Sequence, residues 1–222
     1  MRHKKVKLIA VIVLGLGLTA IHAQTVKDID GNVYKTVTIG AQTWMAKNLK
    51  VTHYRNSDPI PYVTDKTAWS NQITPGYCWY NNDEATYKKT YGALYNWYIV
   101  NTGNLCPSGW HVPTDAEWTT LTNFLGNENI AYNKLKEKGT AHWNSANTGE
   151  TNEFGFTALP GGHCYYDGNF SFIGYRGYWW SSTEYGTDGA WSRSMSINDG
   201  SNTVYRGKYN RQCGFSVRCV MD

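Results

Sequence analysis

Two cysteine-containing segments, far apart in the chain, constrain its fold more than any other feature. The first covers residues 105–118 (LCPSGWHVPTDAEW), and the second covers residues 214–219 (GFSVRC). The first cysteine stands just ahead of a strongly predicted helix, and the second lies in the predicted last strand. A bond between the two would close a loop of about a hundred residues and would strongly restrict the unfolded chain.

The complete set of cysteines leaves the pairing open. The chain has five, namely Cys78, Cys106, Cys164, Cys213 and Cys219. Two bridges and one spare thiol is the simplest arrangement, and fifteen such arrangements exist, so the spacing alone does not choose between them. Oxidation requires a compartment outside the reducing cytoplasm.

Residues 1–23 have the pattern of a secretory signal peptide. Four basic residues precede Leu8, an apolar run follows over residues 8–18, and the small residues Ala20 and Ala23 suit a cleavage site after Ala23. The apolar run is far shorter than the roughly 20 residues that a membrane-spanning helix needs, and no later segment is as apolar. We therefore expect an exported protein that is secreted, periplasmic or at the cell surface, without a transmembrane segment.

Removal of this segment changes the meaning of the formal charge of +4. The segment contains four of the 21 Lys and Arg residues and no acid, so residues 24–222 carry 17 basic and 17 acidic side chains. A chain without net charge is not typical of a nucleic-acid-binding protein.

The length of residues 24–222 suits a single domain. All of the Trp, Tyr and Phe residues fall there, so we expect an aromatic core with many Tyr and Trp side chains partly exposed.

The first half of the chain has clear signals for strands and helices. Residues 26–50 alternate in polarity around two turns and predict an antiparallel meander. Residues 52–76 contain three prolines and predict an ordered surface loop. Residues 87–100 place Tyr91, Leu94, Tyr95 and Tyr98 at helical spacing and predict one short helix.

The most strongly predicted helix follows Pro113. Thr114 and Glu117 form a capping box pattern, and Gly126 marks the end of the helix. Its predicted apolar face comprises Trp118, Leu121, Phe124 and Leu125. A further short helix is predicted over residues 131–138, ending at Gly139. Beyond Gly149 the pattern predicts small strands, over residues 154–159, 178–180, 190–197, 204–205 and 215–220, separated by long polar loops.

Six segments resemble a known family in order along the chain. They are residues 44–49 (WMAKNL), 91–97 (YGALYNW), 106–115 (CPSGWHVPTD), 154–162 (FGFTALPGG), 180–183 (WSST) and 214–219 (GFSVRC). Together they resemble the Fibrobacter succinogenes major paralogous domain, a set of exported bacterial proteins, over residues 28–222. More distantly, the ending and residues 179–184 (WWSSTE) are similar to the C-type lectin-like fold of formylglycine-generating enzyme relatives and of variable receptor-binding proteins.

The resemblance implies an α+β domain of the C-type lectin-like type. It would have an N-terminal antiparallel meander, two to three short helices, a C-terminal half rich in loops, and paired chain ends. It also implies a structural disulfide between Cys106 and Cys219. Cys164 and Cys213 lie outside the family motifs, and their joint presence suggests a second bond, with Cys78 as a buried thiol.

Cofactor and metal chemistry find little support in the sequence. Cys213 has the wrong spacing for the copper-binding cysteine pair of the formylglycine-generating enzymes. His163 beside Cys164 lacks a second ligand pair for zinc. Residues 28–32 and 198–202 have suitable oxygens for calcium, but both are also typical hairpin turns. Phosphate-binding and dinucleotide fingerprints are missing. We therefore expect no cofactor and no metal.

The most promising recognition surface lies within residues 163–211. Its composition combines aromatic rings, which give contact area at low entropic cost, with adaptable polar groups. The candidate ligand-binding residues are Tyr165, Tyr166, Asn169, Tyr175, Arg176, Tyr178, Glu184, Tyr185, Asp188, Trp191, Arg193, Asn198, Asp199, Asn202, Tyr205 and Arg206. The alternative is that these residues bind no ligand and form the ordinary surface of an aromatic-rich fold with little regular structure.

These observations favour a non-catalytic binding protein outside the cell. Its ligand is expected to be a carbohydrate, because aromatic faces stack on sugars, or else a protein partner. One alternative is a subunit or adhesin of an extracellular surface assembly, which predicts an exposed strand edge within residues 26–39. Another is an enzyme, which predicts that at least two of His163, Glu184, Asp188 and Arg193 meet in one deep pocket.

Overall fold

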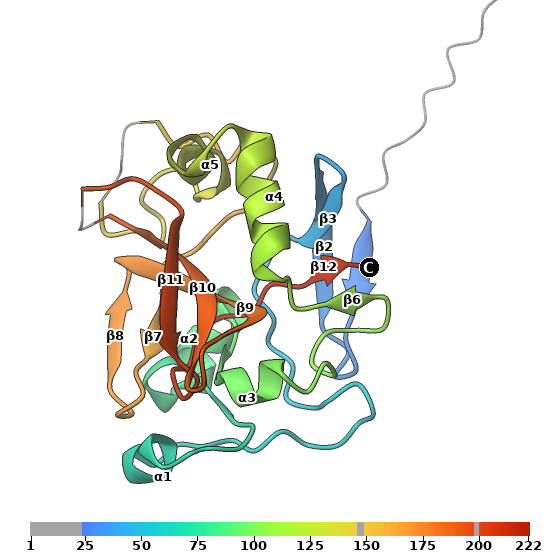
Figure 1. Cartoon of the computed structure of the whole chain (residues 1–222), viewed down its shortest axis with the longest axis vertical. Helices are drawn as coiled ribbons and strands as arrows, with labels where there is room; N and C mark the ends of the chain where they lie inside the picture. The colour runs from blue at the N-terminus through green and yellow to red at the C-terminus, as the bar shows by residue number, and fades with distance from the viewer. Residues whose placement is uncertain (1–23, 146–148, 198–199) are drawn as a thin grey trace, which may run out of the picture.

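The N-terminal residues form an antiparallel meander, as the alternating pattern predicted (Figure 1). The structure is a computed structural model that describes residues 24–145, 149–197 and 200–222. The meander consists of β1 (Thr25–Lys27), β2 (Val33–Ile39) and β3 (Gln42–Met45). Two more strands complete this first sheet, in the order β1-β2-β3-β12-β6. They are β6 (Trp110–His111) and β12 (Val220–Met221), so the last strand lies between two earlier ones.

The C-terminal half contains a second five-stranded sheet, with the order β11-β10-β9-β7-β8. Its strands are β7 (Gly161–Cys164), β8 (Phe170–Ile173), β9 (Arg176–Tyr185), β10 (Gly189–Ser196) and β11 (Tyr205–Asn210). β7 and β9 are parallel, and the other pairs are antiparallel. The strands predicted at residues 178–180 and 190–197 are confirmed as β9 and β10, but β9 has 10 residues and is much longer than predicted, and β7 and β8 were not predicted. Residues 154–159 form no strand, and of residues 215–220 only Val220 belongs to one.

The helix after Pro113 is confirmed as α4 (Asp115–Leu125). Thr114 and Glu117 form the predicted capping box, and Gly126 follows the last turn at φ 124°. The predicted apolar face needs one correction, because Phe124 is exposed and Thr122 is buried in its place. The next helix, α5 (Glu128–Leu135), begins earlier than predicted, because Asn127 caps it by accepting hydrogen bonds from the amides of Asn129 and Ile130. It also ends earlier than predicted, at Leu135.

The predicted single helix over residues 87–100 is divided into three elements. They are α2 (Glu84–Tyr91), β5 (Leu94–Tyr95) and α3 (Trp97–Val100). Gly92 interrupts the helix at φ 78°, and a Cβ atom there would lie 2.5 Å from the carbonyl oxygen of Leu49. β5 then pairs with β4 (Tyr77–Cys78) in a two-stranded ladder. This close approach to Leu49 is a long-range contact that helical periodicity does not reveal.

Two short helical segments fall where the sequence predicted other structure. The predicted loop over residues 52–76 contains α1 (Lys66–Ser70), whose N-cap Asp65 accepts a hydrogen bond from the Ala68 amide. A 3-10 turn, η1 (Tyr80–Asn82), precedes α2. The described residues thus contain five α-helices rather than two or three. Within that part of the chain no helix is both long and apolar enough to cross a membrane.

Helix α4 lies between the two sheets (Figure 1), α5 packs against α4, and both helices share an aromatic core with the sheets. Trp118 of α4 lies 4.8 Å from Trp44 of the first sheet, measured between ring centroids, and its indole N–H donates to the Trp180 carbonyl of the second sheet at 3.4 Å. Nine of the ten Trp side chains are buried, and only Trp191 is partly exposed. The expectation that many Trp rings stay exposed was therefore wrong, whereas several Tyr rings are exposed as expected.

The disulfide between Cys106 and Cys219 is confirmed, with Cα atoms 6.1 Å apart. It ties the segment before β6 to the segment before β12. The second predicted bond, Cys164 to Cys213, is not formed, and both thiols are free and buried, as is Cys78. The two side chains belong to different core clusters, because Cys164 packs with Trp69 whereas Cys213 packs among the residues around Phe215.

The family motifs meet at a buried polar centre around Asn48. Its amide nitrogen donates to the Tyr91 carbonyl at 2.9 Å and to the Ser216 hydroxyl at 3.1 Å. Its amide oxygen accepts from Trp179 and from Arg218, both at 2.9 Å. Three motif segments and Trp179, which directly precedes a fourth, are thereby joined through one side chain, which gives these motifs a structural role.

Candidate functional site

The strongest candidate site is a pocket of about 400 Å³ at one end of the second sheet. We call it the aromatic pocket. It is defined by His163, Tyr165, Asp167, Asn169, Ser171, Phe172, Tyr178 and Tyr209. These residues come from β7, β8, β9 and β11 and from the turn between β7 and β8. Ligand sites of this kind combine apolar walls with a few convergent polar groups.

The turn that forms one wall of the aromatic pocket is fixed by its own hydrogen bonds. Asp167 accepts from the backbone and side-chain N–H groups of Asn169, at 2.9 and 2.6 Å. The Tyr165 amide donates to the Asn169 carbonyl at 2.7 Å, which closes the hairpin. Gly168 takes φ 79°, a conformation that glycine adopts readily. Lys66 of α1 also donates to the Asn169 side chain at 2.6 Å. The polar groups are therefore held in place before any ligand arrives.

The ring of His163 lies at the centre of the aromatic wall. Its centroid is 4.8 Å from Tyr178 and 5.6 Å from both Tyr165 and Phe172. Tyr178 in turn stacks on Phe215 at 4.8 Å. Edge and face contacts of this kind favour fixed ring positions over free rotation.

Burial also sets the protonation state of His163. Burial and, to a smaller extent, the charge of Arg176 lower the pKa of His163 to about 4, so the imidazole is neutral at neutral pH. Its Nδ1 atom has no hydrogen-bond partner among the described residues and is closed off from solvent. A buried polar group without a partner costs about 1–3 kcal/mol, so the aromatic contacts of the ring have to hold His163 in this place.

The predicted recognition residues do not form a single site. Tyr165, Asn169 and Tyr178 line the aromatic pocket, and two neighbours adjoin it. Tyr166 packs on Tyr165 with centroids 4.4 Å apart, and Arg176 donates to the Tyr178 hydroxyl at 3.3 Å. Five of the candidates are thus brought together at one end of the second sheet.

Other candidates gather around the β9–β10 turn. Tyr185 and Asp188 line a second pocket of about 290 Å³, together with Lys208 and Tyr209. Glu184 lies nearby but forms an ion pair with Arg211 at 3.4 Å.

A third group of candidates is engaged with the N-terminus of α4. Arg193 is buried and donates to the Asp115 carboxylate at 2.5 Å. Arg206 binds the same carboxylate at 2.8 Å and lies 3.4 Å from the Trp191 ring centroid. Arg193 therefore anchors β10 to α4 and is not accessible to a ligand at the surface.

The remaining candidates lie apart from these groups. Tyr175, Asn202 and Tyr205 are exposed and line none of these pockets. Asn198 and Asp199 lie outside the described residues. The groups named for the enzyme alternative are also separated, because His163 and Asp188 line different pockets, and Glu184 and Arg193 line neither of them.

Sequence reasoning missed several residues of the aromatic pocket. Asp167 and Ser171 belong to the β7–β8 hairpin, which the turn sequence Tyr166-Asp167-Gly168-Asn169 could have predicted. Phe172 takes φ 67°, which no local signal suggests. Tyr209 comes from β11, at the edge of the sheet opposite β8, and its ring reaches Tyr178 across the face of the sheet, with centroids 5.7 Å apart.

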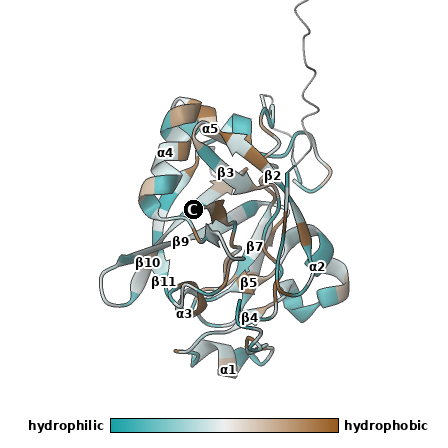
Figure 2. Cartoon of the chain, turned by 90° about the vertical axis from the view of Figure 1, so that its right-hand side faces the viewer, coloured by the Kyte–Doolittle hydropathy of each residue, from teal (hydrophilic) through white to brown (hydrophobic). Residues whose placement is uncertain are grey.

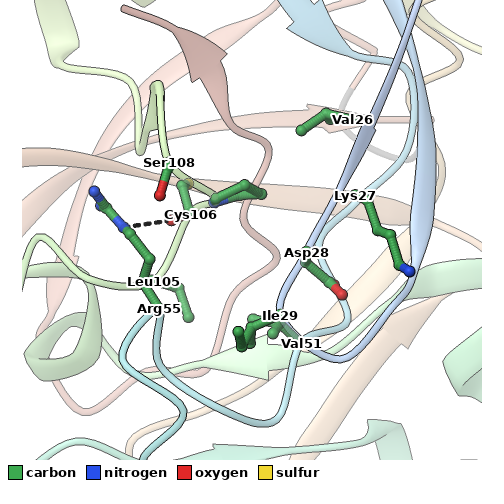
Figure 3. A pocket seen from close by; sticks show the side chains of 10 residues that line it. Val26, Lys27, Asp28, Ile29, Val51, Arg55, Leu105, Cys106 and Ser108 are labelled. Atoms are coloured by element: carbon green, nitrogen blue, oxygen red, sulfur yellow. Dashed lines mark hydrogen bonds between the residues drawn. The ribbon is translucent and has the colours of Figure 1, made fainter.

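A separate hollow of about 240 Å³ lies beside the edge strand β1 (Figure 3). Val26, Val51 and Leu105 are among the side chains around it. Arg55 donates to the Cys106 carbonyl at 3.1 Å and to the Gly103 carbonyl at 2.7 Å, so this cation supports the segment that carries the disulfide. β1 is the edge strand that a surface assembly would require, but it has only 3 residues.

The turn over residues 28–32 and the His163–Cys164 pair belong to no metal-binding cluster among the described residues, whereas the turn over residues 198–202 lies partly outside them. No three His, Cys, Asp or Glu side chains gather there in a way that could hold a metal ion. The Asp28 carboxylate is instead engaged by Asn32 and by the Tyr34 hydroxyl, at 2.8 and 2.6 Å. The Asp28 to Asn32 turn therefore serves the fold.

Comparison with known proteins identifies one family. A family model described as the Fibrobacter succinogenes major domain matches residues 37–221. No curated protein and no solved structure matches the chain. The match covers most of the chain, including the aromatic pocket and the polar centre around Asn48.

Proposed function

The chain belongs to the Fibrobacter succinogenes major domain family, and we propose that it is an exported, non-catalytic protein that binds carbohydrate in the aromatic pocket. Export is supported by the signal-peptide pattern of residues 1–23. Binding is supported by the pocket itself, in which aromatic rings and fixed polar groups converge. The observation that carries the proposal is the pocket wall, in which the rings of His163, Tyr165 and Tyr178 stand beside the hydrogen-bonded turn that holds Asp167 and Asn169.

The fold is proposed to be of the C-type lectin-like type. Three features support this assignment. The N-terminal meander and the last strand share one sheet, two helices pack beside it, and a second sheet presents its turns at the surface. In that arrangement the loops between the last strands form the binding region, which agrees with the place of the aromatic pocket.

The chemistry of the aromatic pocket favours a sugar. Tyr165 is partly exposed and offers a ring face on which the C–H groups of a pyranose can stack. Asp167 and Asn169 stand beside it as acceptor and donor for hydroxyl groups. A neutral His163 suits an uncharged ligand better than a charged imidazole would.

The proposal is tested on the folded protein with an array of neutral polysaccharides and oligosaccharides. We expect binding to a defined subset of these glycans. Tyr165→Ala removes one aromatic face and should weaken the binding to the best array ligand about tenfold. His163→Ala removes the ring on which Tyr165 and Tyr178 pack and should weaken the binding by a similar factor.

Tyr205→Ala is the matched control, because Tyr205 is also an exposed tyrosine of the second sheet but does not line the aromatic pocket. It should bind as the unchanged protein does. The proposal fails if no glycan binds the folded protein, or if the two pocket variants and the control all bind equally well.

A further inference from the structure

Another hollow lies beside α2 and is lined mainly by lysine side chains. Figure 2 shows α2 at one side of the molecule. Its volume is about 470 Å³, and its lining residues are Lys50, Glu84, Ala85, Lys88 and Lys89. We call it the lysine pocket. Its cations come from two segments, because Lys50 follows β3 whereas Lys88 and Lys89 belong to the last turn of α2.

The positive charges in the lysine pocket exceed the negative ones. Glu84 is the one acid among the lining residues, and its carboxylate is paired with Lys88 at 2.6 Å. Partial burial is the largest cause that lowers the pKa of Lys50, and repulsion from Lys47, Lys88 and Lys89 lowers it further. The hollow thus gathers three ammonium groups, and the charge of Lys47 also acts on Lys50, although residues 24–222 carry no net charge as a whole.

Helix electrostatics account for only part of this cluster. Lysines in the last turn of a helix interact favourably with its dipole, which explains Lys88 and Lys89. Lys47 and Lys50 belong to another segment. The backbone of that segment is fixed, because the Lys50 amide donates to the Tyr34 hydroxyl at 3.1 Å and the Ala93 amide donates to the Leu49 carbonyl at 3.0 Å. The fold therefore holds the lysines together through backbone contacts.

Such a cluster suits an anion, because an anion relieves the mutual repulsion of the ammonium groups. No aromatic ring lines the lysine pocket, so it offers no stacking platform for a nucleobase. What it can bind is a group with negatively charged oxygen atoms, such as a sulfate, a phosphate or a carboxylate.

We propose that the lysine pocket binds the anionic substituents of a polysaccharide. The choice of a polysaccharide rests on the proposed carbohydrate-binding function. The site itself is separate from the aromatic pocket, because the two share no lining residue.

The test compares three polymers on the folded protein, namely dextran sulfate, polygalacturonate and uncharged dextran. Dextran sulfate or polygalacturonate should bind, and binding should weaken as salt is added because exposed charges are screened. The variant Lys50→Ala/Lys89→Ala leaves the Lys88–Glu84 pair in place and should bind the anionic polymer about tenfold more weakly.

Lys138→Ala/Lys208→Ala is the matched control, because it removes the same charge from lysines that do not line the lysine pocket. This control variant should retain most of the affinity for the anionic polymer. Tyr165→Ala should also retain binding to the anionic polymer, which separates a failure here from a failure of the aromatic pocket. The proposal is overturned if neither anionic polymer binds, if the control loses as much affinity as the pocket variant, or if a DNA oligonucleotide binds where both polymers do not.

Discussion

At the scale of single residues, this fold buries several charged side chains and gives each a specific set of partners. Arg218 is fully buried and donates to Asn48 and to the carbonyl of Phe156, and burial lowers its pKa to about 9. Lys136 is fully buried and donates to Glu150 at 2.5 Å. Its ammonium group also lies 4.7 Å from the ring centroid of Trp143. Charges of this kind are costly once a partner is lost.

Loss of one partner of the Lys136–Glu150 pair should therefore destabilise the protein strongly. We expect Lys136→Met to lower the free energy of unfolding by about 3–5 kcal/mol, because the Glu150 carboxylate stays buried without its cation. Lys136→Met/Glu150→Leu removes both charges and should recover most of that loss. Denaturant unfolding measures both changes, and a single variant as stable as the unchanged protein would contradict the expectation.

His111 should make stability depend on pH. Partial burial opposes its protonation, but hydrogen bonds to Asp222 at 2.6 Å and to Glu117 at 2.8 Å, with their charges, outweigh burial and raise its pKa above 6.5. The stabilisation is therefore fully present below pH 6.5 and is lost as the pH rises through the raised pKa.

NMR titration of the His111 ring should give this raised pKa, and Asp222→Asn should lower it. His111→Gln should remove the decline in stability above pH 6.5. An unchanged decline in that variant would assign the pH dependence to another group.

At the scale of secondary structure, α4 depends on its N-terminal cap. The Glu117 amide donates to the Thr114 hydroxyl at 3.1 Å, and the Thr114 amide donates to the Glu117 carboxylate at 2.7 Å. We expect Thr114→Ala to cost about 1 kcal/mol of unfolding free energy. Thr120→Ala, an exposed site in the same helix, should change stability by less than about 0.5 kcal/mol. Thermal unfolding separates the two, and equal losses would argue against the cap.

The elements that the sequence predicted well are those with local signals. The cap at Thr114 and the stop at Gly126 lie within α4 and its ends, and the meander carries its alternation within residues 26–50. The interruption at Gly92 depends on Leu49, which is distant in sequence. The aromatic pocket shows the same division. Tyr165 and Asn169 belong to a local hairpin, which the sequence can indicate. Tyr209 comes from a distant edge strand, and the lack of a hydrogen-bond partner for His163 Nδ1 among the described residues depends on all the residues packed around that ring.

At the scale of the whole molecule, the Cys106–Cys219 bond ties together residues that are 113 positions apart. Replacing both cysteines by serine should lower the free energy of unfolding by about 4–5 kcal/mol, according to the chain-entropy relation for a loop of this length. Cys213→Ser is a control, because it replaces a buried thiol that closes no loop. Denaturant unfolding of the three proteins gives the comparison, and similar losses in both variants would show that packing rather than loop closure is responsible.

The place of β12 between β3 and β6 also sets an order of events during synthesis. β1, β2 and β3 leave the ribosome first, yet the sheet cannot join them to β6 until Val220 and Met221 have emerged. Contacts that span so much of the chain are slow to form. The growing polypeptide therefore remains incompletely folded until β12 has been made, and an incompletely folded chain is in the state in which it can be threaded through a narrow channel.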